Sequence, residues 1–124
     1  MQRVKDSGGF GETAGYSRAV RAGTHVAVSA TAPLSEGRVL HPGDAYRQTQ
    51  VAIERALAAA EELGARRDDV VRTRLLLAAD CDWREAVRAH AEAFAEVMPA
   101  NTTYYVGRLI PDGALVEVEL DAAV

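Results

Sequence analysis

Apolar side chains recur at helical spacing in two stretches of the chain, and β-type runs flank both. The first helix is predicted to begin at Asp44, an N-cap residue, and to end before Gly64. The second is predicted to run from Asp82 to about Val97, before Pro99. The β-type runs lie at 16–21, 25–30, 38–40, 70–77, 102–110 and 115–122. The element order is therefore β-β-(β)-α-β-α-β-β.

This order has a consequence for packing. Two amphipathic helices with five or six strands predict an α+β two-layer sandwich, in which both helices cover one face of one mixed sheet. The other sheet face still offers Val, Leu and Tyr side chains, and soluble monomers rarely leave such a patch uncovered. We therefore expect the chain to associate with copies of itself through the sheet, with sites in the clefts between subunits.

The first fifteen residues offer little to a core. Four glycines, Gly8, Gly9, Gly11 and Gly15, surround Phe10, a composition that favours turns. We expect residues 1–15 to be a flexible lead-in. The 124 residues leave room for one hydrophobic core, so a single domain over 1–124 is predicted.

Charge and cysteine content narrow the function classes. Lys and Arg number 14 and Asp and Glu 18, a net charge of −4 that disfavours nucleic acid and anionic membranes as partners. The chain shows neither a signal-peptide core nor a membrane span, so a cytoplasmic location is expected. Cys81 stands alone between two aspartates, and the histidines at 25, 41 and 90 are too scattered for a metal site. No metal and no cofactor are predicted, and His90 is interpreted as a core histidine.

The last strand carries two glutamates on one face. Glu117 and Glu119 alternate with Val116, Val118 and Leu120. One interpretation is a solvated strand face. The other is a general base or water-positioning carboxylate in a cleft, where burial would raise its pKa.

Several segments together, in order along nearly the whole chain, resemble the RidA family, also called YjgF or liver perchloric-acid-soluble protein. They are Gly15-Tyr16-Ser17-Arg18-Ala19-Val20, Ser29-Ala30-Thr31-Ala32-Pro33, Gln48-Thr49, Ala60-Glu61-Glu62-Leu63-Gly64, Asp69-Val70-Val71-Arg72-Thr73, Asp82-Trp83, Pro99-Ala100-Asn101-Thr102 and Val116-Glu117-Val118-Glu119. The resemblance implies a chorismate-mutase-like fold. It also implies a homotrimer whose sheets line a central barrel, with three small-molecule pockets between subunits.

Characterised members of the family hydrolyse 2-imino or 2-enamino acids to 2-keto acids and ammonia without a cofactor. By resemblance, Glu117 is the water-positioning glutamate and Tyr16 supplies a pocket wall and a hydroxyl group. The segment Ser29, Ala30 and Thr31 is expected to meet the substrate with backbone and hydroxyl groups. Thr103, two residues beyond Asn101, is expected to share its face.

Asn101 departs from the family pattern. Active deaminases of the family have an arginine there, which grips a carboxylate with two charge-assisted hydrogen bonds. An asparagine at that position is expected to weaken carboxylate binding by about 2–4 kcal/mol. We nominate Arg74 as the replacement cation, the alternative being that Arg74 forms a solvated or inter-subunit ion pair.

Three functions are consistent with these residues. The first is hydrolysis of an imine, enamine or related small metabolite with water positioned by Glu117. The second is a non-catalytic metabolite-binding or regulatory trimer, in which Asn101 marks the loss of catalysis. The third, endoribonuclease activity, is disfavoured by the net charge and by the lack of a basic stripe.

Overall fold

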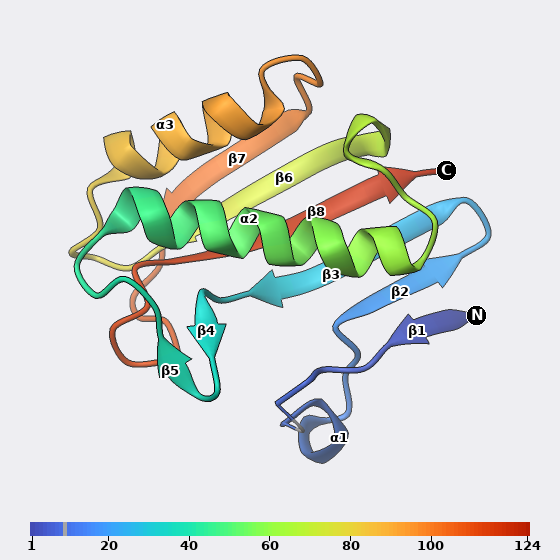
Figure 1. Cartoon of the computed structure of the whole chain (residues 1–124), viewed down its shortest axis with the longest axis horizontal. Helices are drawn as coiled ribbons and strands as arrows, with labels where there is room; N and C mark the ends of the chain where they lie inside the picture. The colour runs from blue at the N-terminus through green and yellow to red at the C-terminus, as the bar shows by residue number, and fades with distance from the viewer. Residues whose placement is uncertain (9) are drawn as a thin grey trace.

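A mixed sheet of six strands forms one layer of the computed structural model, which describes residues 1–8 and 10–124 (Figure 1). The strand order across the sheet is β1-β2-β3-β8-β6-β7. Neighbouring strands are antiparallel except β6 and β7, which run parallel. The bounds are β1 Gln2–Val4, β2 Ala19–Ala22, β3 His25–Thr31, β6 Val70–Leu77, β7 Ala100–Tyr105 and β8 Val116–Ala123.

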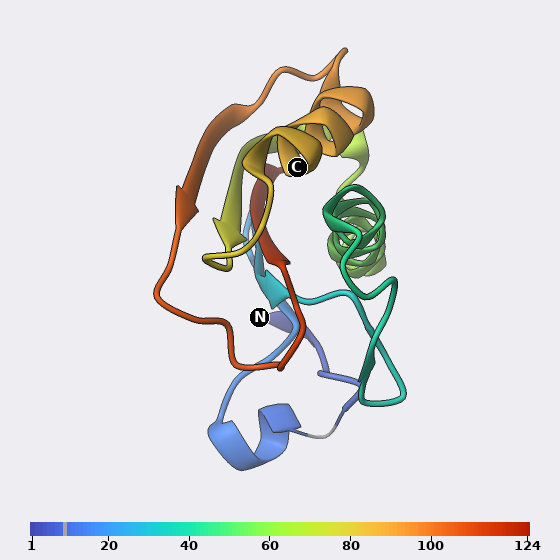
Figure 2. The ribbon, with the colours of Figure 1, turned by 90° about the vertical axis from the view of Figure 1, so that its left-hand side faces the viewer.

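Two long helices form the second layer. Figure 2 shows α2 (Ala45–Glu62) and α3 (Trp83–Phe94) on the same face of the sheet. The smaller elements are α1 (Phe10–Ala14), the β4–β5 hairpin (Leu34–Ser35 and Arg38–Val39) and a 3-10 turn at Arg67–Asp69. The predicted α+β sandwich, with one mixed sheet and both long helices on one face, is confirmed.

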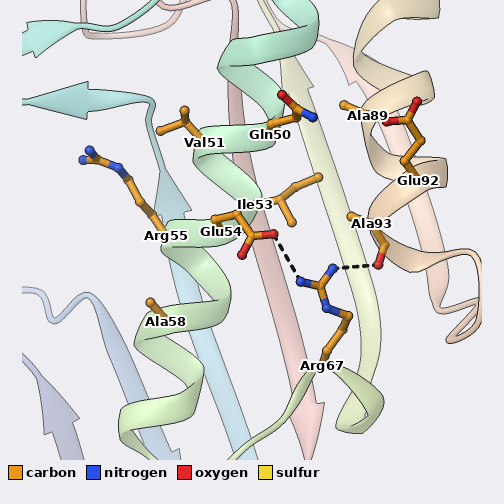
Figure 3. A pocket seen from close by; sticks show the side chains of 10 residues that line it. All are labelled: Gln50, Val51, Ile53, Glu54, Arg55, Ala58, Arg67, Ala89, Glu92 and Ala93. Carbon is orange, nitrogen blue, oxygen red and sulfur yellow. Dashed lines mark hydrogen bonds and ion pairs between the residues drawn. The ribbon is translucent and has the colours of Figure 1, made fainter.

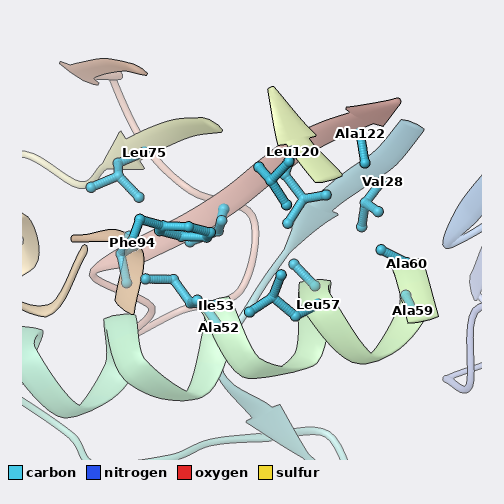
Figure 4. Close-up of a cluster of buried hydrophobic side chains, with 14 of the residues drawn as sticks. Val28, Ala52, Ile53, Leu57, Ala59, Ala60, Leu75, Phe94, Leu120 and Ala122 are labelled. Atoms are coloured by element: carbon cyan, nitrogen blue, oxygen red, sulfur yellow. The ribbon is translucent and has the colours of Figure 1, made fainter. Parts of the chain in front are cut away.

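The core lies between the helices and the sheet (Figure 4). On α2, Ala52 and Ala56 are fully buried, and their small side chains let the helix lie close to the strands beneath. Larger side chains, Ile53, Leu75 and Phe94, fill the remaining space. Each buried aliphatic or aromatic side chain stabilises the fold by about 1.5–3 kcal/mol relative to exposure.

The helix ends follow local rules. The Asp44 side chain accepts a hydrogen bond from the Arg47 backbone N–H at 3.0 Å, and Asp82 does the same for Arg84 at 3.0 Å. Gly64 adopts a φ of +92°, where a side chain would be strained. Helix α3 ends at Phe94, earlier than predicted, and Trp83 at its start is exposed.

The C-terminal strands do not follow the order that their closeness in sequence suggests. Strand β7 ends at Tyr105 rather than at residue 110, and it pairs with β6. A turn begins at Pro111, where the Ala114 N–H donates to the Pro111 carbonyl group at 3.1 Å. The chain then crosses the sheet and inserts β8 between β3 and β6. Strand β8 is apolar on its helix-side face, and the central position buries that face.

Residues 1–15, predicted to be a flexible lead-in, contain two elements in the part that the structure describes. Strand β1 pairs with β2 at the sheet edge, and α1 follows it. The Asp6 carboxylate, between β1 and α1, accepts hydrogen bonds from the Gly11 backbone N–H in α1 at 3.2 Å and from Arg18, just before β2, at 3.0 Å. Gly9, which falls in the predicted lead-in, lies outside the described residues.

The sheet face opposite the helices carries apolar side chains, including the half-buried Leu76. Coverage of this face by copies of the chain stays a prediction. Among residues 1–8 and 10–124, no helix is long and apolar enough to cross a membrane.

Candidate functional site

The candidate residues fall into two groups on opposite faces of the sheet. Strand register places Glu117 opposite Leu76 on the open face. It places Asn101 opposite Thr73, and the Asn101 side chain bonds to the Thr73 hydroxyl, which lies under α3. Within one chain, Glu117 and Asn101 therefore point away from each other.

Glu117 is half-buried on β8. Burial raises the pKa of its carboxyl group, the positive charge of Arg18 partly offsets this, and the negative charge of Glu119 adds to it. A carboxylate with a raised pKa can both accept and donate a proton closer to neutral pH than a solvated glutamate can. A general-base role for Glu117 requires such an environment, and the role itself stays a prediction.

Arg18 contacts the three predicted site residues at the end of β3, Ser29, Ala30 and Thr31. Its guanidinium donates to the backbone carbonyl groups of Ala30 at 2.5 Å and Ser29 at 3.4 Å, and to the Thr31 hydroxyl at 3.2 Å. The pairing of β3 with β8 shifts register between Val28 and Thr31, so the guanidinium braces a bulge in the strand. The structure thus brings Ser29, Ala30 and Thr31 together around one cation.

Asp6 and Tyr16 complete this cluster. The Asp6 carboxylate pairs with Arg18 at 3.0 Å and accepts from the Tyr16 hydroxyl at 3.2 Å. Burial alone would raise the pKa of Asp6, but bonding to Arg18 lowers it overall. Burial and the Asp6 charge raise the pKa of Tyr16. Sequence reasoning missed Arg18 and Asp6, although an arginine inside a short strand was a signal for Arg18.

Arg18→Gln is expected to raise the pKa of Glu117 further, because it removes the positive charge that stabilises the carboxylate. The change is measured by titrating the Glu117 side-chain carbon in NMR spectra. Arg21→Gln is the matched control, since Arg21 lies three residues further along, in β2, and bonds to the backbone carbonyl groups of Leu63 and Gly23. A Glu117 midpoint that stays the same in Arg18→Gln would contradict this account.

Arg74, nominated as the replacement cation, forms an ion pair within the chain. Its guanidinium lies 3.3 Å from the Glu119 carboxylate on the open face. Arg74 and Asn101 therefore project from opposite sides of the sheet. Arg108 lies beyond the end of β7 and pairs with Asp112 at 3.1 Å.

Asn101 belongs to a chain of hydrogen bonds under α3. Its Nδ2 lies 3.0 Å from Thr73 Oγ1, which lies 2.7 Å from His90 Nε2. The Thr103 hydroxyl donates to Asn101 Oδ1 at 2.8 Å, so Thr103 shares the face of Asn101 as its spacing predicts. His90 is half-buried, and burial lowers its pKa. These hydrogen bonds end at Thr103, which lines a pocket of about 260 Å³ together with Leu77, Trp83, Tyr104 and Tyr105.

A larger groove of about 640 Å³ lies between the outer surfaces of α2 and α3 (Figure 3). There the Arg67 guanidinium bridges the Glu54 carboxylate at 3.1 Å and the Ala93 carbonyl group at 2.7 Å. None of the predicted site residues lines it. Its size therefore does not make it the candidate site.

The described residues show no grouping of three His, Cys, Asp or Glu side chains that could hold a metal ion. Cys81 is buried, and burial together with the charges of Asp82 and Asp80 raises its pKa to about 11. The thiol is therefore protonated at neutral pH and a poor nucleophile.

A family model and a solved structure each match nearly the whole chain. The sequence model of a family described as endoribonuclease L-PSP matches residues 10–124. The chain belongs to this family, the RidA/YjgF family. The predicted membership and the chorismate-mutase-like fold are thereby confirmed.

Three relatives within or near the RidA/YjgF family are informative. An uncharacterized protein of Streptomyces coelicolor is 37% identical over 122 residues, 98% of this chain and 91% of that protein. The 3-aminoacrylate deaminase RutC of Acinetobacter baylyi is 34% identical over 104 residues, 83% of this chain and 82% of that protein. A solved structure from Mycobacterium tuberculosis, described as a member of the highly conserved YjgF/YER057c/UK114 family, is 37% identical with a TM-score of 0.86. That likeness covers 99% of this chain and 98% of the other.

Proposed function

We propose that this RidA/YjgF protein hydrolyses a small enamine or imine, with a water molecule positioned by Glu117. The observation that carries the proposal is the half-buried Glu117, whose pKa is raised beside a polar cluster of Arg18, Tyr16 and Thr31. The similarity to 3-aminoacrylate deaminase RutC, an enzyme whose named substrate is an enamine, supports it.

The chemistry needs one group that moves protons. As water adds to the C=N carbon, a carbon–oxygen bond forms and the Glu117 carboxylate accepts a proton from the water. The carboxyl group returns this proton to the imine nitrogen, which gives a neutral carbinolamine. As the carbon–nitrogen bond breaks, the carboxylate takes the second proton from the hydroxyl group and passes it to the departing nitrogen, so that the carbonyl group forms. The products are a carbonyl compound and ammonia, and no electrons are exchanged with a cofactor. An enamine enters the same route after protonation at carbon converts it to the imine.

We further propose that complete sites form between copies in a homotrimer. Glu117 and the Asn101–Thr103 pair lie on opposite faces of the sheet in one chain, so a second copy is needed to bring one group to the other. The uncovered apolar sheet face supports such an assembly, and family members of this fold are generally small-molecule-binding trimers.

A coupled assay tests the proposed reaction. A dehydratase generates 2-iminobutyrate, and loss of the intermediate is followed with and without the protein, alongside an enamine that lacks a carboxylate. We expect faster hydrolysis of the uncharged enamine and a smaller effect on 2-iminobutyrate. Asn101→Arg is expected to raise the rate with 2-iminobutyrate by about tenfold or more, because it restores a charge-assisted carboxylate contact.

If neither intermediate disappears faster in the presence of the protein, hydrolysis is not its function. The second candidate, a non-catalytic metabolite-binding trimer, is then favoured by the neutral Asn101 amide in place of a cation. Calorimetry with small amides and keto acids distinguishes it, since that candidate requires saturable binding without turnover.

A further inference from the structure

The hydrogen bonds of Asn101 have a fixed direction. Asn101 Nδ2 lies 3.4 Å from the Thr73 backbone carbonyl oxygen and 3.0 Å from Thr73 Oγ1. A carbonyl oxygen only accepts hydrogen bonds, so the side-chain atom that faces it must be the NH₂ group. The amide oxygen of Asn101 is therefore turned toward Thr103.

This direction extends to the neighbouring hydroxyl groups. The Thr73 hydroxyl accepts from Asn101 Nδ2 and lies 2.7 Å from His90 Nε2. At the other end, the Thr103 hydroxyl donates its hydrogen to Asn101 Oδ1 at 2.8 Å. Because that hydrogen is used, the Thr103 oxygen presents only lone pairs to the pocket.

The remaining walls of the pocket add flat apolar surface and little polarity. Trp83, Tyr105 and Leu77 line it, and the Tyr105 hydroxyl donates to the Cys81 carbonyl group at 2.8 Å. None of the described side chains that line the pocket is charged. One cation lies beside the pocket wall: the Arg84 guanidinium is 4.8 Å from the centre of the Trp83 ring.

We propose that this pocket binds its ligand through a hydrogen-bond donor, an amide or enamine N–H, and not through a carboxylate. The Thr103 oxygen accepts that N–H while an attached apolar group packs against Trp83. This assigns a substrate class to the proposed function, an uncharged enamine or imine at this end of the site. Only the reaction itself rests on the proposed function.

Two shape-matched probes test the proposal without any turnover. Isobutyramide and isobutyrate have the same carbon skeleton and differ in charge at pH 7.5. Trp83 is the only tryptophan of the chain, so its fluorescence, or the NMR signal of its indole N–H, reports binding in the pocket. We expect saturable binding of isobutyramide, with an affinity at least tenfold above that of isobutyrate.

Three variants test the physical cause. Thr103→Val keeps the shape and removes the acceptor, so isobutyramide should bind about tenfold more weakly. Thr73→Val removes one of the two acceptors that orient Asn101, the hydroxyl, and the preference for the amide should fall several-fold. Asn101→Arg should reverse the preference. Arg84→Gln is the control, and the preference for the amide should be unchanged in it.

Several results would overturn the proposal. They are isobutyrate binding as tightly as isobutyramide, isobutyrate binding that depends on Arg84, no detectable binding of either probe, or an unchanged affinity in Thr103→Val. Failure of the proposed function is distinguishable, because the amide preference would then persist without any hydrolysis in the coupled assay. Rapid hydrolysis of 2-iminobutyrate that isobutyrate inhibits would instead support the hydrolase function and contradict the preference for an uncharged ligand.

Discussion

Glu117→Gln is expected to lower kcat/KM by at least about 100-fold. The substrate for this test is the enamine whose hydrolysis the natural protein accelerates most. A glutamine has nearly the same shape as a glutamate but cannot take a proton from water, and general base groups contribute about 10²–10⁴-fold to rate. The measurement is kcat/KM from the coupled assay. Substrate binding should change little, because the proposed substrate contact is the Thr103 oxygen and a glutamine keeps the shape of the glutamate.

Glu119→Gln is the matched control. Glu119 lies two residues further along the same strand and is also half-buried, but it pairs with Arg74. Its replacement should change kcat/KM by less than about threefold. Equal losses in the two variants, or full activity of Glu117→Gln, would show that Glu117 does not act as the base.

Stability separates a chemical effect from unfolding. The raised pKa means that the folded protein binds a proton at Glu117 more tightly than the unfolded chain does. The stability contributed by this group is therefore complete below the unfolded pKa and falls as pH rises through the folded pKa. Glu117→Gln escapes that loss, so the variant should gain in melting temperature relative to the natural protein between pH 4 and pH 7.5.

Gln48→Leu is expected to lower the free energy of unfolding by about 2–4 kcal/mol, because it leaves several buried polar groups without partners. Gln48 is fully buried in α2. Its NH₂ group donates to the carbonyl groups of His41 at 3.2 Å and Gly113 at 3.3 Å, and its oxygen accepts from the Leu115 N–H at 2.8 Å. A leucine of similar size makes none of these bonds. Urea unfolding measures the difference.

The control is Gln50→Leu on the same helix. Gln50 is exposed and bonds only to the Tyr46 hydroxyl at 3.0 Å among the described residues, so its replacement should change stability by less than about 0.5 kcal/mol. The Gln48 bonds hold the segment that enters β8 two residues before Glu117, so we also expect Gln48→Leu to lower activity. A stability loss below about 1 kcal/mol would mean that these groups find other partners.

The sequence by itself determined the local elements. The alanine-rich stripe between Asp44 and Gly64 defined α2, and the β-branched start of residues 70–77 defined β6. Both patterns depend on neighbours three or four residues apart, or two in a strand, which a single sequence displays directly. The resemblance to RidA extended this to the fold, because it compares the whole chain at once.

Only the tertiary structure decided which residues meet. The insertion of β8 between β3 and β6 depends on packing between segments far apart in the sequence, and no local pattern shows it. That insertion sends Glu117 and Asn101 to opposite faces and pairs Arg74 with Glu119. Tertiary contacts also decided the role of Arg18, which binds the bulge of β3 and pairs with Asp6. The glycine-rich start of the chain gave no sign of these contacts. Side-chain direction follows strand register, and register is set by the burial of a whole sheet face and not by any one residue.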